Sequence, residues 1–298
     1  MSEHLTKEVS QWLTLSNDER ISKIQTPKWI GYPAAKDILE RMEELFLYPQ
    51  CDRMPNMMII GQTNNGKTSL LKRFCASHPA SDNPHGESAI VPVLYVQCPD
   101  KPDEHKLYAR ILSRLFAPYK SSDRADKKYD QVVRVCEQVQ LKVLILDEMQ
   151  HVISGNTNAQ RIFLNVIKML GNDLRIPIIA AGIPEANNAM QTDEQISNRF
   201  EPWVLHRWQL DENFLRLLAS FERLIPLKHP SYLTHPDMAQ KLYMMTEGLL
   251  GELSNVLVKS SILAVKSGSE RITQKELKNI KWIVPSERRK EANKAAEY

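Results

Sequence analysis

A phosphate-binding loop is predicted at residues 61–68 (GQTNNGKT), which match the pattern GxxxxGK[ST]. An apolar run precedes this loop and an amphipathic segment follows it, as a strand–loop–helix motif requires. Glycines let backbone N–H groups curve around phosphate oxygens, and the start of the following helix adds partial positive charge. Lys67 can reach the β- and γ-phosphates of a nucleotide, and the Thr68 hydroxyl can ligate Mg²⁺. The predicted nucleotide-binding residues are Gly61, Gln62, Thr63, Asn64, Asn65, Gly66, Lys67, Thr68 and Ser69.

Two adjacent carboxylates, Asp147 and Glu148, follow the apolar run 143–146. That run predicts a buried strand, and ligands of open α/β sheets bind beyond the carboxyl ends of the strands. Asp147 is therefore placed to hold Mg²⁺ through water, and Glu148 to polarise the water that attacks a phosphate. An acidic pair can also simply end a strand. Its position 80 residues after Lys67 favours nucleotide hydrolysis and argues against a small-molecule kinase.

Short apolar runs that alternate with amphipathic stretches predict the elements that position these residues. Such buried strands, separated by helices, are typical of a parallel sheet covered on both faces. The runs lie at residues 57–60, 90–96, 142–146, 176–181 and 203–205. After residue 210 only helical periodicity remains, and it predicts helices at 211–225, 236–247, 250–267 and 273–280. The predicted fold class is α/β, followed by an all-helical part.

The segment before the first strand is also predicted to be helical. Ser16 and Glu19 have the spacing of a capping box at a helix start. Pro33 suits the start of another helix, whose apolar residues form one stripe and which ends near Pro49. Residues 79–88 (PASDNPHGES) are rich in turn formers and predict a loop.

A length of 298 residues predicts one large or two small domains. The composition is that of a globular protein, because 42% of the residues are hydrophobic and 25% are charged. No apolar run reaches the roughly 18–20 residues of a membrane span, and the N-terminus lacks the pattern of a secretory signal. The four cysteines lack CxxC spacing and are interpreted as reduced thiols. These features predict a cytoplasmic protein without a membrane partner.

The net charge of +3 is unevenly distributed along the chain. Residues 266–298 hold nine Lys or Arg against five Asp or Glu, and residues 101–128 hold eight against four. On a predicted helix at 104–117, three cations follow an i, i+4, i+8 pattern and share one face. Such a stripe can neutralise DNA phosphates without reading bases, although a basic helix face can also be merely solvated. The predicted DNA-binding residues are Lys101, Lys106, Arg110, Arg114 and Lys120.

By these motifs the sequence resembles the AAA+ ATPases, and among them the transposition regulators of the TniB/TnsC type. The phosphate motifs are typical of P-loop ATPases in general, and the segments DEMQH and GELS point to the transposition branch. The resemblance extends over most of residues 28–265. The segments that carry it are GQTNNGKTSLLKRF (61–74), VLILDEMQHV (143–152), IPIIAAGIPEA (176–186), SNRF (197–200) and TEGLLGELSNVL (246–257).

The resemblance implies a five-stranded parallel P-loop sheet with a C-terminal helical lid, and ATP with Mg²⁺ as ligands. Arg199 would be an arginine finger that reaches the nucleotide of a neighbouring subunit, so that Lys67, Glu148 and Arg199 act together in hydrolysis. The segment 29–32 would flank the adenine, although its aromatic residues can equally serve packing. A homo-oligomeric ring or filament would hold double-stranded DNA, and its partners would be a transposase and a target-selection adaptor protein.

Two positions depart from the AAA+ pattern. The end of the fourth strand, Ala181-Gly182-Ile183, offers no polar sensor side chain. The lid has Glu252 where the family often carries an arginine, and a carboxylate cannot replace a cation beside phosphates. We therefore expect weak coupling between lid and nucleotide, and slow turnover.

The predicted organisation comprises an N-terminal helical segment (1–50), the nucleotide-binding domain (51–209), a helical lid (210–282) and a basic polar tail (283–298). The predicted function is ATP-dependent, DNA-associated regulation of transposition, without nuclease chemistry. A replication-initiator or helicase-loader ATPase is an alternative, and so is a signalling ATPase that binds no DNA. The tail cations either contact DNA or a partner, or only solubilise the terminus; they are Arg288, Arg289, Lys290 and Lys294.

Overall fold

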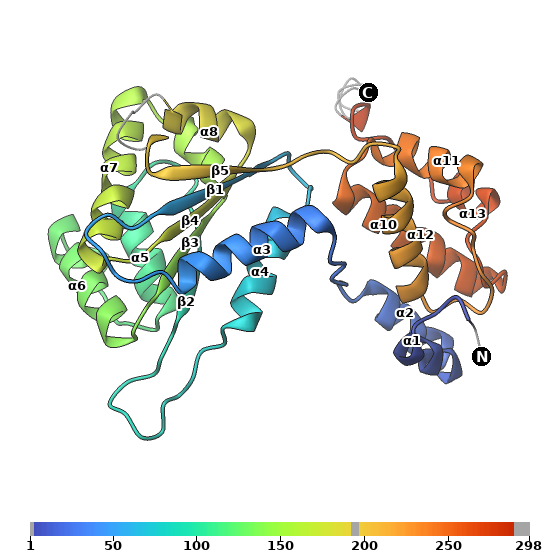
Figure 1. Cartoon of the computed structure of the whole chain (residues 1–298), viewed down its shortest axis with the longest axis horizontal. Coiled ribbons are helices and arrows are strands. Elements are labelled where there is room, and N and C mark those ends of the chain that lie inside the picture. The colour runs from blue at the N-terminus through green and yellow to red at the C-terminus, as the bar shows by residue number, and fades with distance from the viewer. Residues whose placement is uncertain (1–2, 192–196, 289–298) are drawn as a thin grey trace. The chain divides into compact units, whose positions relative to one another are not determined.

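The structure is a computed structural model that describes residues 3–191 and 197–288. The chain forms two compact units, which are described separately (Figure 1). The sheet unit consists of Pro33–His206, and the helical unit combines Met1–Tyr32 with Arg207–Tyr298. This grouping differs from the segments predicted from sequence, because the first 32 residues pack with the C-terminal helices.

The sheet unit is built on a five-stranded parallel sheet with the strand order β2-β3-β4-β1-β5 (Figure 1). All residues of β1, β3 and β4 are buried. Successive side chains of a strand point to opposite faces, so both faces of the sheet are covered. The predicted α/β fold class is therefore confirmed. The strands are β1 (Asn56–Gly61), β2 (Val93–Gln97), β3 (Val143–Asp147), β4 (Ile178–Gly182) and β5 (Phe200–Leu205).

Helices and one 3₁₀ segment cover this sheet, and one large apolar core lies on one of its faces. Helix α4 begins directly after the phosphate loop, and the 3₁₀ segment η2 follows the end of β3 by one residue. The elements are α3 (Pro33–Phe46), α4 (Lys67–Ser77), α5 (Glu104–Arg114), α6 (Ala125–Gln138), η2 (Met149–Ser154), α7 (Thr157–Leu174) and α8 (Pro184–Gln191).

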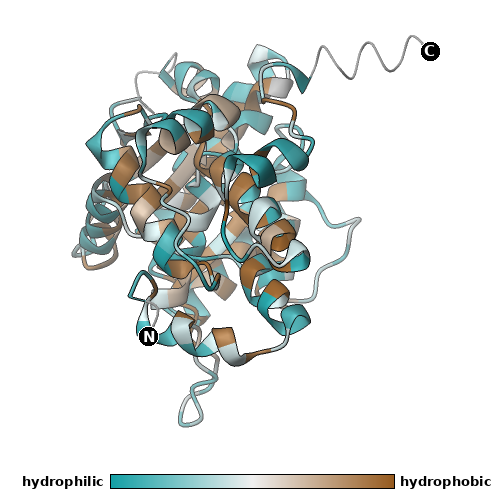
Figure 2. Cartoon of the chain, turned by 90° about the vertical axis from the view of Figure 1, so that its right-hand side faces the viewer, coloured by the Kyte–Doolittle hydropathy of each residue, from teal (hydrophilic) through white to brown (hydrophobic). Residues whose placement is uncertain are grey.

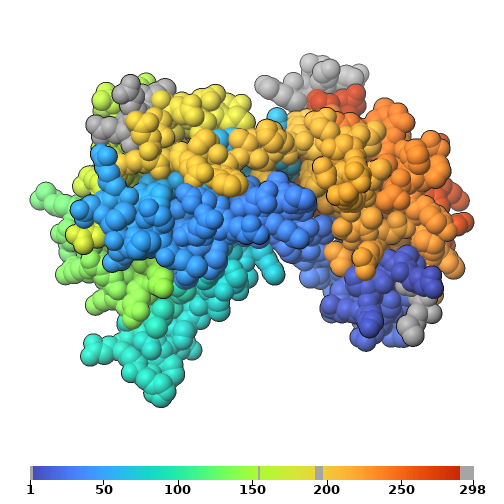
Figure 3. All heavy atoms as spheres, viewed as in Figure 1, coloured from blue at the N-terminus to red at the C-terminus, as the bar shows by residue number. Residues whose placement is uncertain are grey.

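Two strands begin three residues away from the start of the apolar runs that predicted them. Strand β2 starts only at Val93, because Pro92 has no N–H to donate and Ile90 instead forms an isolated antiparallel bridge with Ser81. That bridge lies at the base of the turn-rich loop 79–88, whose teal spheres stand out in Figure 3. Strand β5 starts at Phe200, three residues before the predicted run. Its first residues were missed because β5 is an edge strand with exposed residues and with Pro202, so its apolar signal is weak.

The helical unit contains only helices within residues 3–32 and 207–288. Four helices lie within one or two residues of the predicted ranges, and the capping box of Ser16 and Glu19 is present. In Figure 2, brown apolar and teal hydrophilic residues alternate along these helices, as amphipathic packing requires. The elements are α1 (Lys7–Gln11), η1 (Trp12–Thr14), α2 (Asn17–Gln25), α10 (Glu212–Leu224), α11 (Pro236–Thr246), α12 (Leu250–Ser267) and α13 (Gln274–Asn279).

Within the described ranges, no individual helix has the length and apolarity to cross a membrane. Only α11 and α12 taken together meet those two criteria, and the pair is bent by 116°.

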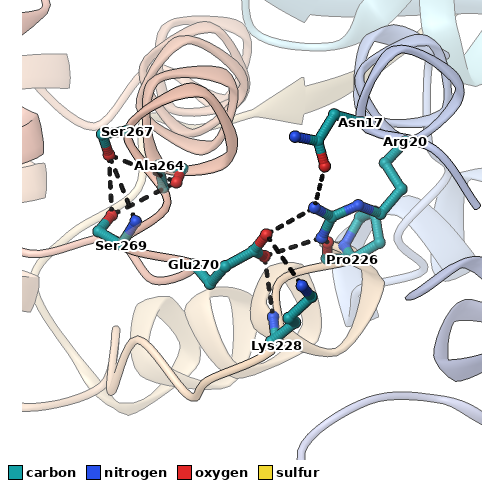
Figure 4. Close-up of polar contacts among 8 residues, drawn as sticks. All are labelled: Asn17, Arg20, Pro226, Lys228, Ala264, Ser267, Ser269 and Glu270. Atoms are coloured by element: carbon teal, nitrogen blue, oxygen red, sulfur yellow. Dashed lines mark hydrogen bonds and ion pairs between the residues drawn. The ribbon is translucent and has the colours of Figure 1, made fainter. Parts of the chain in front are cut away.

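A buried ion pair joins the N-terminal and C-terminal parts of the helical unit (Figure 4). Arg20 on α2 donates two hydrogen bonds to the carboxylate of Glu270, which follows α12. The two side chains are 1% and 9% exposed. Burial alone would raise the pKa of Glu270, but the hydrogen bonds and charge of Arg20, with a smaller effect of Lys228, lower it. This pair holds together residues 250 positions apart in the chain.

We expect Arg20→Ala to lower the free energy of unfolding of the helical unit by about 3 kcal/mol, because the buried carboxylate of Glu270 loses its main partner and keeps only the longer contacts with Lys228. Chemical denaturation at pH 7 measures this effect. Arg216→Ala is the matched control, since Arg216 forms an exposed pair with Glu212, and it should cost about 1 kcal/mol or less. Similar values for both variants would contradict the prediction.

The ion pair of Arg20 and Glu270 also makes the stability of the helical unit depend on pH. Because the pKa of Glu270 is lower in the folded state, its stabilisation is complete above the ordinary carboxyl pKa and is lost as the pH falls through the folded value.

Candidate functional site

The phosphate loop joins β1 to α4 at the carboxyl edge of the sheet. Asn64 and Gly66 both adopt left-handed backbone conformations, with φ of 63° and 91°. These two residues turn the chain sharply before α4 begins at Lys67. Gly66, at the N-cap position, has no side chain that could cap the first turn of α4, so the N–H groups of that turn are directed at the space enclosed by the loop.

The Lys67 side chain lies along this loop. Its ammonium donates hydrogen bonds to the carbonyl oxygens of Gly61 (2.7 Å) and Gln62 (2.9 Å). Burial lowers the pKa of Lys67, and the nearby charges of Asp147 and Glu148 oppose that shift. Lys67 is thus a buried cation whose partners are neutral carbonyls, which a phosphate can replace with a stronger charge-assisted contact.

Asp147 is held by three donors. The Thr68 hydroxyl and the Tyr95 hydroxyl each donate to Oδ2 at 2.7 Å, and the backbone N–H of Glu148 donates to Oδ1 at 2.8 Å. The structure therefore brings the two predicted Mg²⁺ ligands, Thr68 and Asp147, into direct contact. Sequence reasoning missed Tyr95. Gln97 of β2 pairs with Asp147 of β3, and Tyr95 lies two residues before Gln97. Tyr95 therefore lies on the same face of the sheet as Asp147, and this alternation is the signal that could have found it.

Glu148 follows the end of β3 in a left-handed conformation, with φ of 62°. Its carboxylate accepts a hydrogen bond from the side-chain amide of Gln150, whose own Oε1 is buried without a partner among the described residues. Gln150 was also missed from the sequence. The sequence shows that Gln150 lies two residues after Glu148 in the DEMQ segment. It does not show the 3₁₀ turn that brings the two side chains together.

Asn65 fastens the phosphate loop to the end of the neighbouring strand. Its side-chain amide donates to the carbonyl oxygens of Leu205 (2.9 Å) and His206 (3.0 Å), where β5 ends. Its Oδ1 is buried without a partner in the described part of the chain. The loop is thereby fixed at its middle and at both ends before any ligand arrives.

These residues fit a nucleoside triphosphate with Mg²⁺. The hydroxyl of Thr68 and the carboxylate of Asp147 are hard oxygen donors, which Mg²⁺ prefers when it also binds phosphate and water. A buried lysine and uncapped backbone N–H groups face the position that the phosphates would take. Thr63 and Ser69 flank these groups in the loop and in the first turn of α4.

The two departures from the AAA+ pattern have structural reasons. A Cβ atom at Gly182 would meet side-chain atoms of Met58, Met149 and Ala186 at 3.1–3.2 Å, so this position at the end of β4 leaves little room for a larger side chain. Glu252, in the first turn of α12, is buried and accepts two hydrogen bonds from Arg288. Glu252 thus has a structural role within the helical unit, and the guanidinium of Arg288 is already hydrogen-bonded there.

The remaining predicted tail cations, Arg289, Lys290 and Lys294, lie outside the described residues. The segment 29–32 ends at Tyr32, whose ring packs edge-on against Trp208 at 5.0 Å. Burial raises the pKa of Tyr32 to about 12. At least this aromatic residue therefore takes part in packing of the helical unit.

Arg199 lies at the opposite edge of the sheet from the phosphate loop. It precedes β5, and the next residue, Phe200, pairs with Asn56 at the start of β1. Gly61 is five positions further along β1, about 17 Å away at ~3.3 Å per residue. The guanidinium donates to Asn172 on α7 at 2.7 Å and lines a cavity of about 710 Å³ that Arg53 and Lys168 also line. Arg199 therefore cannot serve the phosphate loop of its own chain.

The predicted basic stripe does form one surface on α5. Lys106, Arg110 and Arg114 all line a cavity of about 360 Å³ between α5 and the edge strand β2. Their partners differ, however. Arg110 donates to the carbonyl oxygens of Gln97 (2.8 Å) and Cys98 (2.7 Å), and Lys106 pairs with Asp100 at 3.3 Å.

The other cations of this region also divide into paired and unpaired groups. Lys127 and Arg124 form ion pairs with Asp123 and Asp126, and Lys128 is buried. Among the cations of residues 101–128, three form no side-chain ion pair or hydrogen bond with the described residues: Lys101, Arg114 and Lys120.

A parallel sheet in this order, with a phosphate loop after β1 and an Asp-Glu pair after β3, is the fold of a P-loop AAA+ ATPase. Residues 20–210 match the family described as Bacterial TniB protein. The chain belongs to this TniB family, as its motifs predicted. A comparison with curated protein sequences gave no match.

Solved structures share the fold at low sequence identity. The Aeropyrum pernix Orc1 protein in complex with DNA is 12% identical with a TM-score of 0.55, over 94% of this chain and 70% of that one. Cdc6p of Pyrobaculum aerophilum is 14% identical with a TM-score of 0.61, over 87% and 69%. A Walker-type ATPase of Pyrococcus abyssi is 13% identical with a TM-score of 0.52, over 83% and 69%.

Proposed function

We propose that this chain is an ATP-dependent, DNA-binding regulator of DNA transposition. In this role it selects target DNA and recruits or activates a transposase, and ATP hydrolysis controls its assembly. The observation that carries the proposal is the contact of Thr68 with Asp147, which unites the phosphate loop and the acidic pair in a chain of the TniB family.

The residues of the site divide the work of hydrolysis. Lys67 exchanges its carbonyl partners for β- and γ-phosphate oxygens, while the N–H groups of α4 bind the remaining phosphate charge. Mg²⁺ held by Thr68 and Asp147 would neutralise charge on the phosphate oxygens. Glu148 orients and polarises the attacking water once its carboxylate leaves Gln150. Tyr95 keeps Asp147 in place throughout.

Arg199 makes hydrolysis depend on assembly in this proposal. Because this residue lies at the far edge of its own sheet, a guanidinium that stabilises phosphate charge must come from another subunit. The cavity beside it, with Arg53 and Lys168, gives the edge the positive charge that would face a neighbour's nucleotide. Hydrolysis therefore depends on a homo-oligomer, whether ring or filament.

The basic surface of α5 supports the DNA-binding part of the proposal. Its cations contact phosphate, and no base-reading motif was found in the sequence, so binding should be sequence-tolerant. A helicase-loader or replication-initiator function shares these features, and the fold is also that of Orc1 and Cdc6p. Stimulation of strand transfer by a cognate transposase would favour the transposition role, whereas helicase loading would favour the alternative.

We expect the triple variant Lys106→Ala, Arg110→Ala and Arg114→Ala to bind all duplex sequences more weakly. Each lost phosphate contact reduces the slope of log affinity against log salt by ~0.9, so the slope should flatten by up to about 2.7 per subunit. Titration of random duplexes at several salt concentrations, with and without ATP, measures both quantities. ATP hydrolysis without DNA should stay nearly unchanged, because these residues are outside the phosphate site.

A control must separate local contacts from total charge. The variant Lys7→Ala, Lys266→Ala and Lys278→Ala removes the same three charges from exposed positions of the helical unit. It should leave the salt slope as in the wild type. If the α5 variant has unaltered affinity and slope, the stripe is only a solvated face. Absence of duplex binding by the wild type would favour a signalling switch.

A further inference from the structure

Phe116 is the most exposed large apolar residue in the described part of the chain. Its side chain is 95% exposed, and it follows the end of α5 in the segment 114–120 (RLFAPYK). The backbone of Phe116 is left-handed, with φ of 53°, a conformation that favours glycine and is rare for a bulky residue. Burial in a core therefore does not explain why a large apolar side chain occupies this position, and the turn itself would form more easily with a glycine.

The backbone around Phe116 is nevertheless well fixed. The N–H of Phe116 bonds to the carbonyl of Ser113 (3.2 Å) and that of Ala117 to Leu112 (2.9 Å), which is the Schellman pattern of a helix end. Gln131 on α6 donates to the carbonyl of Pro118 at 2.6 Å. The segment thus holds an aromatic ring out in solvent on a rigid support.

Two cations lie close to Phe116 in the sequence. Arg114 and Lys120, two positions before and four after Phe116, are two of the three cations in residues 101–128 that form no side-chain ion pair or hydrogen bond with the described residues. The buried Lys128 fixes the same loop, since it donates to the carbonyl of Ser121 at 2.9 Å and lies over the ring of Tyr119. An exposed apolar ring in a segment that also carries cations without ion pairs is complementary to a stacked base step between two phosphate backbones.

We propose that Phe116 inserts as a wedge at a base step of duplex DNA, while Arg114 and Lys120 bind the flanking phosphates. This inference rests on the proposed DNA binding and adds a mode of recognition to it. Side chains such as Phe partially unstack a base step and kink the duplex. Recognition would then depend on how easily the DNA deforms, not on base identity, and flexible or already unstacked sites would be preferred.

Two measurements on the full chain test the wedge. The first is the fluorescence of 2-aminopurine placed in a duplex, which rises when the base loses its stacking partner. The second is the ratio of affinities for a duplex with an abasic site and for the matched duplex. For the wild type we expect an increase in fluorescence and about tenfold tighter binding to the abasic duplex, because the unstacking penalty is already met there. Phe116→Ala should lose both effects and keep the salt slope.

The controls keep a structural effect apart. Phe116→Gly removes the same ring and relieves the left-handed backbone, so it should be at least as stable as the wild type and also lose both effects. Tyr232→Ala removes another exposed aromatic residue, with φ of 52°, from the helical unit and should change neither.

The outcomes separate this inference from the proposed function. Duplex binding with a wild-type salt slope, but without a fluorescence change or abasic preference, would overturn the wedge and leave DNA binding intact. A Phe116→Ala variant that keeps both DNA effects but fails to assemble or to bind a transposase would assign the ring to a protein contact instead. If the wild type binds no duplex, both proposals fail.

Discussion

The Glu148→Gln variant should bind ATP as tightly as the wild type and hydrolyse it about 10²- to 10⁴-fold more slowly. An amide cannot accept the proton of the attacking water, whereas the groups that bind phosphate are untouched. Lys67 and the first turn of α4 remain as they are. Equilibrium binding of a fluorescent ATP analogue and steady-state phosphate release measure the two effects separately.

Two further variants make this test specific. Lys67→Ala should abolish nucleotide binding, because the phosphates lose their main cationic side chain. Glu185→Gln removes an exposed carboxylate from α8 of the same unit and should change neither binding nor turnover. Equal turnover in the wild type and Glu148→Gln would show that another group activates the water.

Arg199→Ala should lower the turnover of the assembled protein by about 10³- to 10⁵-fold, the range for loss of an arginine finger. Nucleotide binding by each chain should be unaffected, since Arg199 lies at the other edge of the sheet. Arg199→Lys keeps the charge but not the planar fork and should be intermediate. Arg175→Ala is a matched control, because Arg175 is an exposed arginine of the same unit with only a long ion pair to Asp52, at 3.8 Å.

A mixing experiment distinguishes action in trans from a structural role of the Arg199 contact with Asn172. Arg199→Ala supplies intact phosphate loops, and Lys67→Ala supplies intact arginines. If mixed assemblies form, they should recover part of the activity that neither variant has alone. Mixed assemblies without any recovery would mean that Arg199 stabilises its own chain and does not reach a neighbour's nucleotide.

Much of the fold is predictable from the sequence because its signals are local. The buried strands β1, β3 and β4 appear as continuous apolar runs, and the glycines and lysine of the phosphate loop have a fixed spacing. The helices after residue 210 show clear periodicity. Where burial is incomplete the signal weakens, which is why β5 was found only in part and why the helix predicted at 104–117 ends at Arg114, before the left-handed Phe116.

Only the tertiary structure decides which groups meet. The contact of Thr68 with Asp147 spans 79 positions, that of Tyr95 with Asp147 spans 52, and the ion pair of Arg20 and Glu270 spans 250. Such pairs depend on strand order and helix packing, which no single segment encodes.

The same reason applies to the cations of α5. The sequence determined that they share a helix face, since helical spacing is a local property. It did not determine that Arg110 is held by the carbonyls at the end of β2 while Arg114 forms no side-chain ion pair or hydrogen bond with the described residues, or that Phe116 is exposed. The neighbouring strand and the helix end decide which charges are available, because a side chain that is already hydrogen-bonded must give up that partner before it can bind a ligand.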